Sequence, residues 1–254
     1  MLILYGRAKG QVHKERKLPC QDYVRLKTIP FGFIFAIADG AGSAPLSHLG
    51  AYFATKGFVN FISKVLEKNT NIDFQLLRQL IKDAFIKARE ELKKVAERKN
   101  VALKALHTTL YAGCYYKEQL ICAGIGDSFG LVITSSNEIM FPVEPCKGEF
   151  INETVFITMD KWQEFLNISP TITSPKAFIA FSDGLLNIIY SMKYQEGVWQ
   201  IIPDCEFIGR LIRYICENFH RNLKKEFLIM LSSSRAQDLN DDDKALLVAI
   251  FKEH

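Results

Sequence analysis

The residues of this chain best placed to do chemistry are aspartates at the ends of apolar runs. Asp39 follows the run 33–38, Asp183 follows the run 177–182, and a glycine comes next in both cases. The ends of neighbouring antiparallel strands lie side by side, so carboxylates placed there can gather at one edge of a sheet. A glycine lets the backbone approach such a site closely, and a carbonyl such as that of Gly40 could itself bind an ion.

The spacing predicts which aspartates meet. A hairpin centred just after Pro30 places Asp22 as far before the turn as Asp39 lies after it, so we expect these two carboxylates to be neighbours. A second hairpin, turning at Lys117, brings Asp127 back towards the start of its partner strand.

The last group of aspartates precedes the final apolar run of the chain. If that run pairs antiparallel with the strand before Asp183, then Asp183 meets Asp242. Asp241 and Asp243 remain open as alternatives to Asp242.

Carboxylates crowded in this way cannot all stay ionised unless a cation neutralises them. Oxygen ligands without a histidine or thiolate cluster select hard cations, magnesium or manganese. Two such ions about 3.5–4 Å apart can activate a water and clamp a phosphoryl oxygen. One Asp-Gly alone typically marks only a turn, and it is the convergence of four such places that favours a metal site.

Strands and helices must hold these ends together. Residues 22–28 alternate as a half-buried strand does, whereas 33–38 are apolar throughout, as in a central strand. Single apolar stripes predict helices over 47–68 and 73–98, with Asn71 or Asp73 as the cap of the second.

The second half of the chain is predicted in less detail, and 144–175 is its least regular part. We expect a meander, a strand over 177–181, a helix over 207–219 and a closing strand over 245–251. The four runs of the meander are 108–116, 120–124, 129–134 and 139–143. This order indicates an α+β fold in which helices pack outside antiparallel sheet.

Composition limits the class of protein. The chain has 254 residues, 48% hydrophobic and 24% charged, which predicts one globular domain over 1–254. A net charge of +4 without a basic stripe argues against nucleic acid, and no apolar run is long enough for a membrane helix. The six cysteines form no C-x-x-C pair and suit buried free thiols. We expect a cytoplasmic monomer.

In its motifs the chain resembles the metal-dependent protein phosphatases, the type 2C Ser/Thr family, over nearly its whole length. The matching motifs, in chain order, are Cys20-Gln21-Asp22, Phe35–Gly42, Thr108-Thr109-Leu110, Gly126-Asp127-Ser128, Ser182-Asp183-Gly184 and Asp242-Asp243. His13, Pro19-Cys20-Gln21-Asp22 and the segment 148–154 look closer still to a largely bacterial branch of that family.

The resemblance implies a four-layer α-β-β-α sandwich, with two central antiparallel sheets flanked by helix pairs. It also implies a phosphoprotein substrate and direct attack of a metal-bridging hydroxide on phosphoserine or phosphothreonine. Two Mg or Mn ions would be bound, Asp39 bridging both and the Gly40 carbonyl binding one. Asp183 and Asp242 would bind the other ion.

Further roles follow from the resemblance, together with two departures from the family's pattern. Asp22 would orient the attacking water, and Asp127 would help to hold a third, weaker ion. The family's glutamate before the first aspartate is Gln21 here, and its phosphate-binding arginine falls on Lys17. Lysine binds phosphate as a point charge and not bidentately, and His13 is a second candidate for that contact.

Two other functions compete with a phosphatase. Gln21 and the missing arginine motivate a weakly active or inactive scaffold that binds phosphoproteins, and such a scaffold need not bind two ions. A two-metal nuclease is the other alternative, against which the modest net charge argues.

Overall fold

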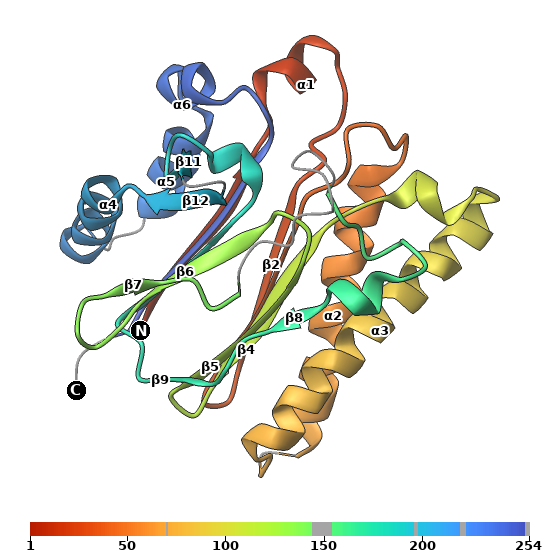
Figure 1. The fold of residues 1–254 in the computed structure, drawn as a ribbon, viewed down its shortest axis with the longest axis horizontal. Helices are drawn as coiled ribbons and strands as arrows, with labels where there is room; N and C mark the ends of the chain where they lie inside the picture. The colour runs from red at the N-terminus through yellow and green to blue at the C-terminus, as the bar shows by residue number, and fades with distance from the viewer. Residues whose placement is uncertain (70, 144–153, 196–197, 219–221, 252–254) are drawn as a thin grey trace.

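The computed structural model describes residues 1–69, 71–143, 154–195, 198–218 and 222–251. Two antiparallel sheets face each other in these ranges, and helices cover the outer face of each sheet (Figure 1). This is the α-β-β-α sandwich of the α+β class that the resemblance implied. Among the described helices, none has both the length and the apolar character needed to cross a lipid bilayer.

The first sheet carries the predicted hairpins. Its strands, in spatial order, are β2 (Tyr23–Ile29), β3 (Gly32–Ala38), β4 (Leu110–Tyr116), β5 (Gln119–Ile125) and β8 (Asn167–Ile168), and β9 (Ile172–Thr173) also pairs with β5. Neighbouring strands are antiparallel, and both hairpins turn where the sequence predicted.

The second sheet brings the two ends of the chain together. Its strands, in spatial order, are β1 (Leu2–Ala8), β13 (Lys244–Ile250), β10 (Ala177–Phe181), β6 (Phe129–Ile133) and β7 (Ile139–Met140). A separate ribbon of β11 (Tyr190–Gln195) and β12 (Val198–Pro203) lies on the side of α4 and α5 (Figure 1).

The two long helices cover the first sheet, and shorter ones cover the second (Figure 1). The helices are α1 (Gln11–Glu15), α2 (Ser47–Lys68), α3 (Phe74–Lys99), α4 (Cys205–Glu217), α5 (Leu223–Ser232) and α6 (Ser234–Leu239), with short 3₁₀ turns at Leu103–Leu106, Trp162–Phe165 and Asp183–Leu185. Asp73 caps α3, because its side chain accepts a hydrogen bond from Leu76 N at 2.8 Å.

Strand β3 shows why a run can be apolar throughout. Phe35 points into the core between the sheets, where its ring centroid lies 4.7 Å from that of Phe178. Ile34, the residue before Phe35 in the strand, points to the opposite face and packs among the apolar residues of α2 and α3. Both faces of the strand are buried, so burial selects an apolar residue at every position.

The meander predicted over 108–143 is wrong between its second and third strands, whereas its first pair and its last pair of strands are confirmed. Strand β6 pairs with β10 and β7 in the second sheet, and not with β5. The chain crosses between the sheets at Gly126-Asp127-Ser128. Apolar runs buried on both faces carry no signal of the sheet to which they belong, so the spacing alone could not reveal this crossing.

Several elements were not predicted at all. These are β1, the short α1, the ribbon β11–β12, and the helices α5 and α6. Of the cysteines in the described ranges, Cys114 and Cys122 are buried as expected, whereas Cys205 and Cys216 are exposed on α4. Cys146 lies outside the described residues.

Candidate active site

Asp22 and Asp39 stand opposite each other at the open end of the first hairpin. The register pairs Tyr23 with Ala38, so the next position outwards pairs Asp22 with Asp39, as the spacing predicted. Asp22 is 1% exposed, and its Oδ2 accepts a hydrogen bond from Ser182 Oγ at 2.5 Å. Since Ser182 follows β10, this contact joins the two sheets at the site.

A pair of threonines holds the backbone of Asp39. Thr109 N and Thr108 Oγ1 both donate to the Asp39 carbonyl at 2.8 Å, and Asp39 N donates to Thr109 Oγ1 at 3.0 Å. Gly40 then packs against the start of α2, where an added Cβ would lie 2.7 Å from the Ser47 backbone. The backbone of residue 39 therefore has little freedom to move.

Three carboxylates converge beyond these strand ends. Oxygen atoms of Asp39, Asp127 and Asp183 all lie within 4.8 Å of one another, and each residue keeps part of its surface exposed. Burial, and then the charge of Asp22, raise the pKa of Asp39 well above its ordinary value. Burial, and then the charge of Asp39, do the same to the pKa of Asp183.

These residues fit a divalent cation. Thr154 Oγ1 donates to Asp127 Oδ2 at 2.7 Å, whereas the buried Asp127 Oδ1 has no hydrogen-bond partner among the described residues. Buried polar atoms are normally paired, so an orphaned oxygen beside two further carboxylates is what a hard cation would satisfy.

The predicted pairing of Asp183 with Asp242 is off by two residues. The register of β10 and β13 pairs Phe181 with Leu246, which sets position 183 opposite Lys244. Asp242 stays close enough for its charge to raise the pKa of Asp183. The two strands are far apart in sequence, so no hairpin turn fixes their register and the ends of the runs were a poor guide to it.

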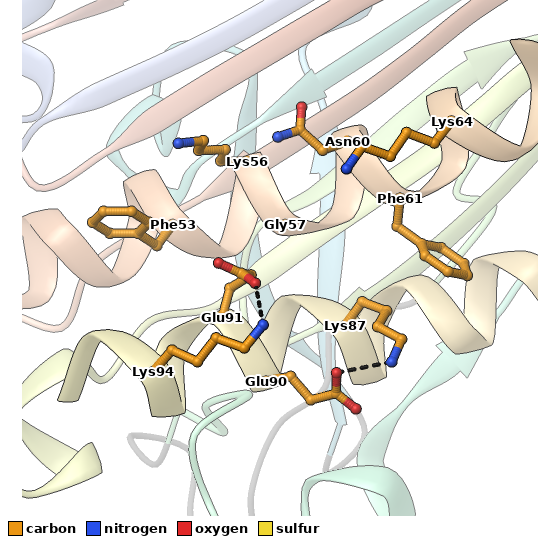
Figure 2. Close-up of a pocket in the computed structure, with 10 residues that line it drawn as sticks. All are labelled: Phe53, Lys56, Gly57, Asn60, Phe61, Lys64, Lys87, Glu90, Glu91 and Lys94. Atoms are coloured by element: carbon orange, nitrogen blue, oxygen red, sulfur yellow. Dashed lines mark hydrogen bonds and ion pairs between the residues drawn. The ribbon is translucent and has the colours of Figure 1, made fainter. Parts of the chain in front are cut away.

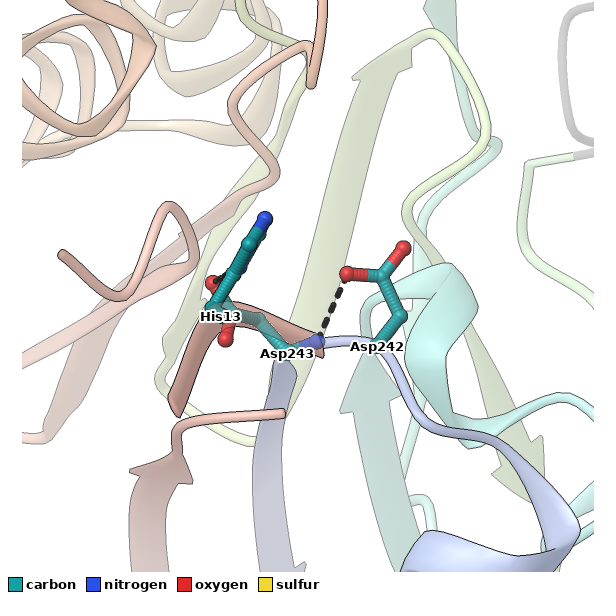
Figure 3. A group of neighbouring side chains, drawn as sticks. All are labelled: His13, Asp242 and Asp243. Atoms are coloured by element: carbon teal, nitrogen blue, oxygen red, sulfur yellow. Dashed lines mark hydrogen bonds and ion pairs between the residues drawn. The ribbon is translucent and has the colours of Figure 1, made fainter. Parts of the chain in front are cut away.

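Asp242 instead lies in a second group, with His13 and Asp243, whose ligand atoms are also within 4.8 Å of one another (Figure 3). Asp242 is exposed, whereas Asp243 is buried and its Oδ2 lies 2.8 Å from His13 Nδ1. Lys17, the other candidate phosphate ligand, is exposed just after α1 with a left-handed backbone (φ 57°). Residues 148–153 of the branch-specific motif lie outside the described residues.

Lys244 is a charged group of the site that sequence reasoning missed. It is fully buried, and its Nζ donates to the carbonyls of Asn240 at 2.5 Å and Asp242 at 2.8 Å. Burial lowers the pKa of Lys244, against the opposing effect of the Asp242 charge. A lysine opening an apolar strand directly after three aspartates was the signal that could have revealed it.

A hollow of about 350 Å³ on the outer face of α2 and α3 lies away from these carboxylates (Figure 2). It is crossed by exposed ion pairs, Lys87 Nζ to Glu90 Oε2 at 2.9 Å and Lys94 Nζ to Glu91 Oε1 at 2.8 Å. None of its lining residues belongs to either group of candidate ligands. The converging carboxylates, and not this solvated hollow, therefore define the candidate site.

Replacing Gly184 should disturb the strand end that carries Asp183. A Cβ at position 184 would lie 1.7 Å from the carbonyl oxygen of Asp243, in the backbone of the adjoining segment. We expect Gly184→Ala to lower the free energy of unfolding by about 2–3 kcal/mol, as overpacking does, measured by urea denaturation.

Gly209→Ala in α4 is the matched control, because nothing lies within 4 Å of a Cβ there. That variant should gain up to about 1 kcal/mol from helix propensity. Equal urea midpoints for the two variants would contradict the tight packing inferred at Gly184.

Comparison with known proteins points to one family. Residues 9–227 match the family model described as protein phosphatase 2C. The chain is 24% identical over 263 residues to serine/threonine-protein phosphatase 3 of Escherichia coli (strain K12), covering 99% of this chain and 98% of the relative.

Solved structures share the fold. A bacterial serine phosphatase superposes with a TM-score of 0.69 at 15% identity, covering 100% of this chain and 99% of the other. RsbX, solved in complex with magnesium, superposes with a TM-score of 0.52 at 16% identity, covering 98% of this chain and 94% of the other.

Proposed function

This chain belongs to the protein phosphatase 2C family, a family of phosphoprotein phosphatases, and we propose that it hydrolyses phosphoserine and phosphothreonine in proteins with the help of two divalent cations. The observation that carries the proposal is the group of Asp39, Asp127 and Asp183, with its orphaned Asp127 oxygen. Family and site support the proposal independently, one from the whole chain and the other from local chemistry.

We assign the ions to the aspartates at the strand ends. Asp39 would contact both ions, the Gly40 carbonyl one of them, and Asp183 with Asp242 the other. Asp127 would contribute to a third, weaker site. When bound, magnesium or manganese would offset the charge of the phosphoryl group and make water a better nucleophile near neutral pH.

The choice of magnesium or manganese rests on the donor set. The converging ligands are all oxygens, which favours hard cations over zinc or copper. The similar protein RsbX was solved with magnesium, which agrees with this choice.

The chain's own residues would orient the reactants. Asp22, whose Oδ2 accepts a hydrogen bond from Ser182 Oγ, would orient the attacking water. Lys17 and His13, on the segment that includes α1, would supply positive charge and a hydrogen bond to the phosphate. Lysine acts there as a point charge, which we expect to bind phosphate less selectively than a bidentate arginine would.

The test is hydrolysis of p-nitrophenyl phosphate with manganese and with EDTA. We expect turnover that requires metal and returns when manganese is restored after chelation. Full activity in EDTA would contradict the proposal. A folded protein that binds phosphopeptide without turning over either this substrate or the peptide would instead support the scaffold alternative.

We also propose that residues 1–254 form a single catalytic domain that acts as a cytoplasmic monomer, without nucleic acid or membrane as partners. The family match and the relative's alignment, which span most of the chain, support the single domain. Light scattering after size exclusion tests the oligomeric state, and a dimer mass would contradict it.

A further inference from the structure

Cations and aromatic rings alternate along one side of the molecule, starting at the strand end that carries Asp22. Arg7 Nη1 donates to the Asp22 carbonyl at 2.7 Å, and the Arg7 guanidinium carbon lies 4.4 Å from the Tyr23 ring centroid. The Arg25 guanidinium carbon lies 5.2 Å from the Tyr23 centroid and 5.1 Å from the centroid of Tyr52, which is on α2. These contacts connect β1, β2 and α2 next to the candidate site.

The alternation continues onto the outer face of α2 and α3. Lys56 Nζ lies 5.6 Å from the Phe53 ring centroid, and the guanidinium carbon of Arg98, from α3, lies 5.8 Å from the same centroid. Lys64, about two turns further along α2, lines the same hollow as Lys56 (Figure 2). Because α2 begins beside Gly40, Lys56 and Lys64 lie successively farther from the site.

The cations of this surface have no counterions in the described part of the protein. We name them the basic row: Arg7, Arg25, Lys56, Lys64 and Arg98. No described carboxylate forms an ion pair with any of them. The single acidic residue of α2, Glu67, pairs instead with Lys27 at 2.6 Å. The basic row therefore presents positive charge that an anionic partner would complement.

Part of the Arg25 side chain is buried without a partner. Its Nε and Nη2 are shielded from solvent, and neither has a hydrogen-bond partner among the described residues. The rings of Tyr23 and Tyr52 stabilise this charge in part. Because a partly buried charge is screened weakly, an anion bound at the exposed Arg7 would be attracted by Arg25 as well.

The aromatic rings of this surface favour a protein partner over nucleic acid. Single-stranded nucleic acid binds basic surfaces largely by stacking its bases on aromatic rings. Tyr23 is already contacted by two guanidinium groups, and Tyr52 by one guanidinium group and one ammonium group. Carboxylates need only the exposed cations, which Arg7, Lys64 and Arg98 provide. Acidic side chains of a protein are therefore the anions that fit the basic row.

We propose that the basic row binds acidic side chains that flank the phosphorylated residue of a protein substrate, an inference that rests on the proposed phosphatase function. The phosphorylated residue would lie at the converging carboxylates, and the acidic residues would lie along β2 and α2. From Ser47, beside Gly40, to Lys64 the helix rises about 25 Å, which an extended peptide covers in about eight residues.

The test compares two phosphoserine peptides that extend this far on both sides of the phosphorylated residue. One carries Asp and Glu at the flanking positions, and the other carries Asn and Gln at the same positions. We expect wild-type kcat/KM to be about tenfold higher for the acidic peptide in about 0.05 M salt, since each exposed ion pair contributes about twofold and several act together. In about 0.5 M salt the preference should fall to about twofold, because exposed charges are then screened.

Variants locate the preference on the surface. Lys56→Gln combined with Lys64→Gln should lower the preference to about threefold. Arg7→Gln should lower it as well, and any effect of that change on Asp22 cancels in the ratio of the two peptides. The matched control is Lys193→Gln combined with Lys225→Gln, which removes the same charge from exposed positions on β11 and α5 and should keep the wild-type preference.

The outcomes separate this role from others. Equal kcat/KM for the two peptides in the wild type would overturn the role of the basic row and leave the phosphatase standing. A preference that the α2 double variant keeps, or that the control loses equally, would show that net charge and not the basic row selects the peptide. Inhibition by polyuridylate that only the α2 double variant escapes, without a preference between peptides, would assign the row to nucleic acid instead. A wild type inactive on both peptides and on p-nitrophenyl phosphate would overturn the phosphatase itself, and this role with it.

Discussion

Asp39→Asn should lower kcat on p-nitrophenyl phosphate in manganese by about a thousandfold or more. Asp39 lies in the group of carboxylates that we propose to hold the ions, and its backbone is fixed by Thr108 and Thr109. An amide of the same shape keeps the packing but removes the charge that attracts the cations. A bound metal ion stabilises the charge of the transition state by several kcal/mol. Each 1.36 kcal/mol of that stabilisation changes the rate about tenfold.

Stability distinguishes this loss from misfolding. In EDTA, Asp39→Asn should melt at or above the temperature of the wild type, because one of several repelling carboxylates is gone. Asp238→Asn is the control for loss of a carboxylate elsewhere, and it should retain full activity. A variant at position 39 that keeps more than a tenth of wild-type kcat would contradict the assigned role.

The metal-free protein should become more stable as the pH falls from neutral towards 4. Burial is the largest cause that raises the pKa of Asp22, Asp39 and Asp183 above their ordinary values, and neighbouring carboxylates add to it. The folded state then binds more protons than the unfolded state between the ordinary and the raised pKa values. In that window the free energy of unfolding decreases as the pH rises.

The measurement is the melting temperature against pH, in EDTA and with manganese. Bound cations stabilise the ionised carboxylates, so manganese should raise the melting temperature most near neutral pH and least at low pH. Asp39→Asn should flatten the slope in EDTA. A melting temperature in EDTA that falls steadily from pH 7 to pH 5 would contradict the raised pKa values of these carboxylates.

The parts of the site that could be predicted from sequence are those set by a local turn. Asp22 and Asp39 face each other because a tight hairpin joins their strands and counting from its centre fixes the register. The pairing near Asp183 is fixed by packing between distant segments, which the sequence does not display. The predicted register, which paired Asp183 with Asp242, is therefore wrong by two residues.

The same limit explains the other differences. Strand β6 reads like the strands of the hairpin before it, yet the turn at Asp127 sends it into the other sheet. Asp243 and Lys244 looked like a charged loop and the start of a strand, but both are buried because hydrogen-bond partners from distant segments satisfy them. Side-chain type alone does not reveal such partners.

The carboxylates of the site come from both sheets. Asp22 and Asp39 end strands of the first sheet, Asp183 ends a strand of the second, and Asp127 lies where the chain passes between them. Ions bound jointly by these groups would cross-link the two sheets on that side of the sandwich. Part of the binding free energy of the ions would then stabilise the packing of one sheet against the other. Amide hydrogen exchange at the strand ends beside Asp39 and Asp183 would then slow together when the ions bind, while amides at the opposite edge would change little.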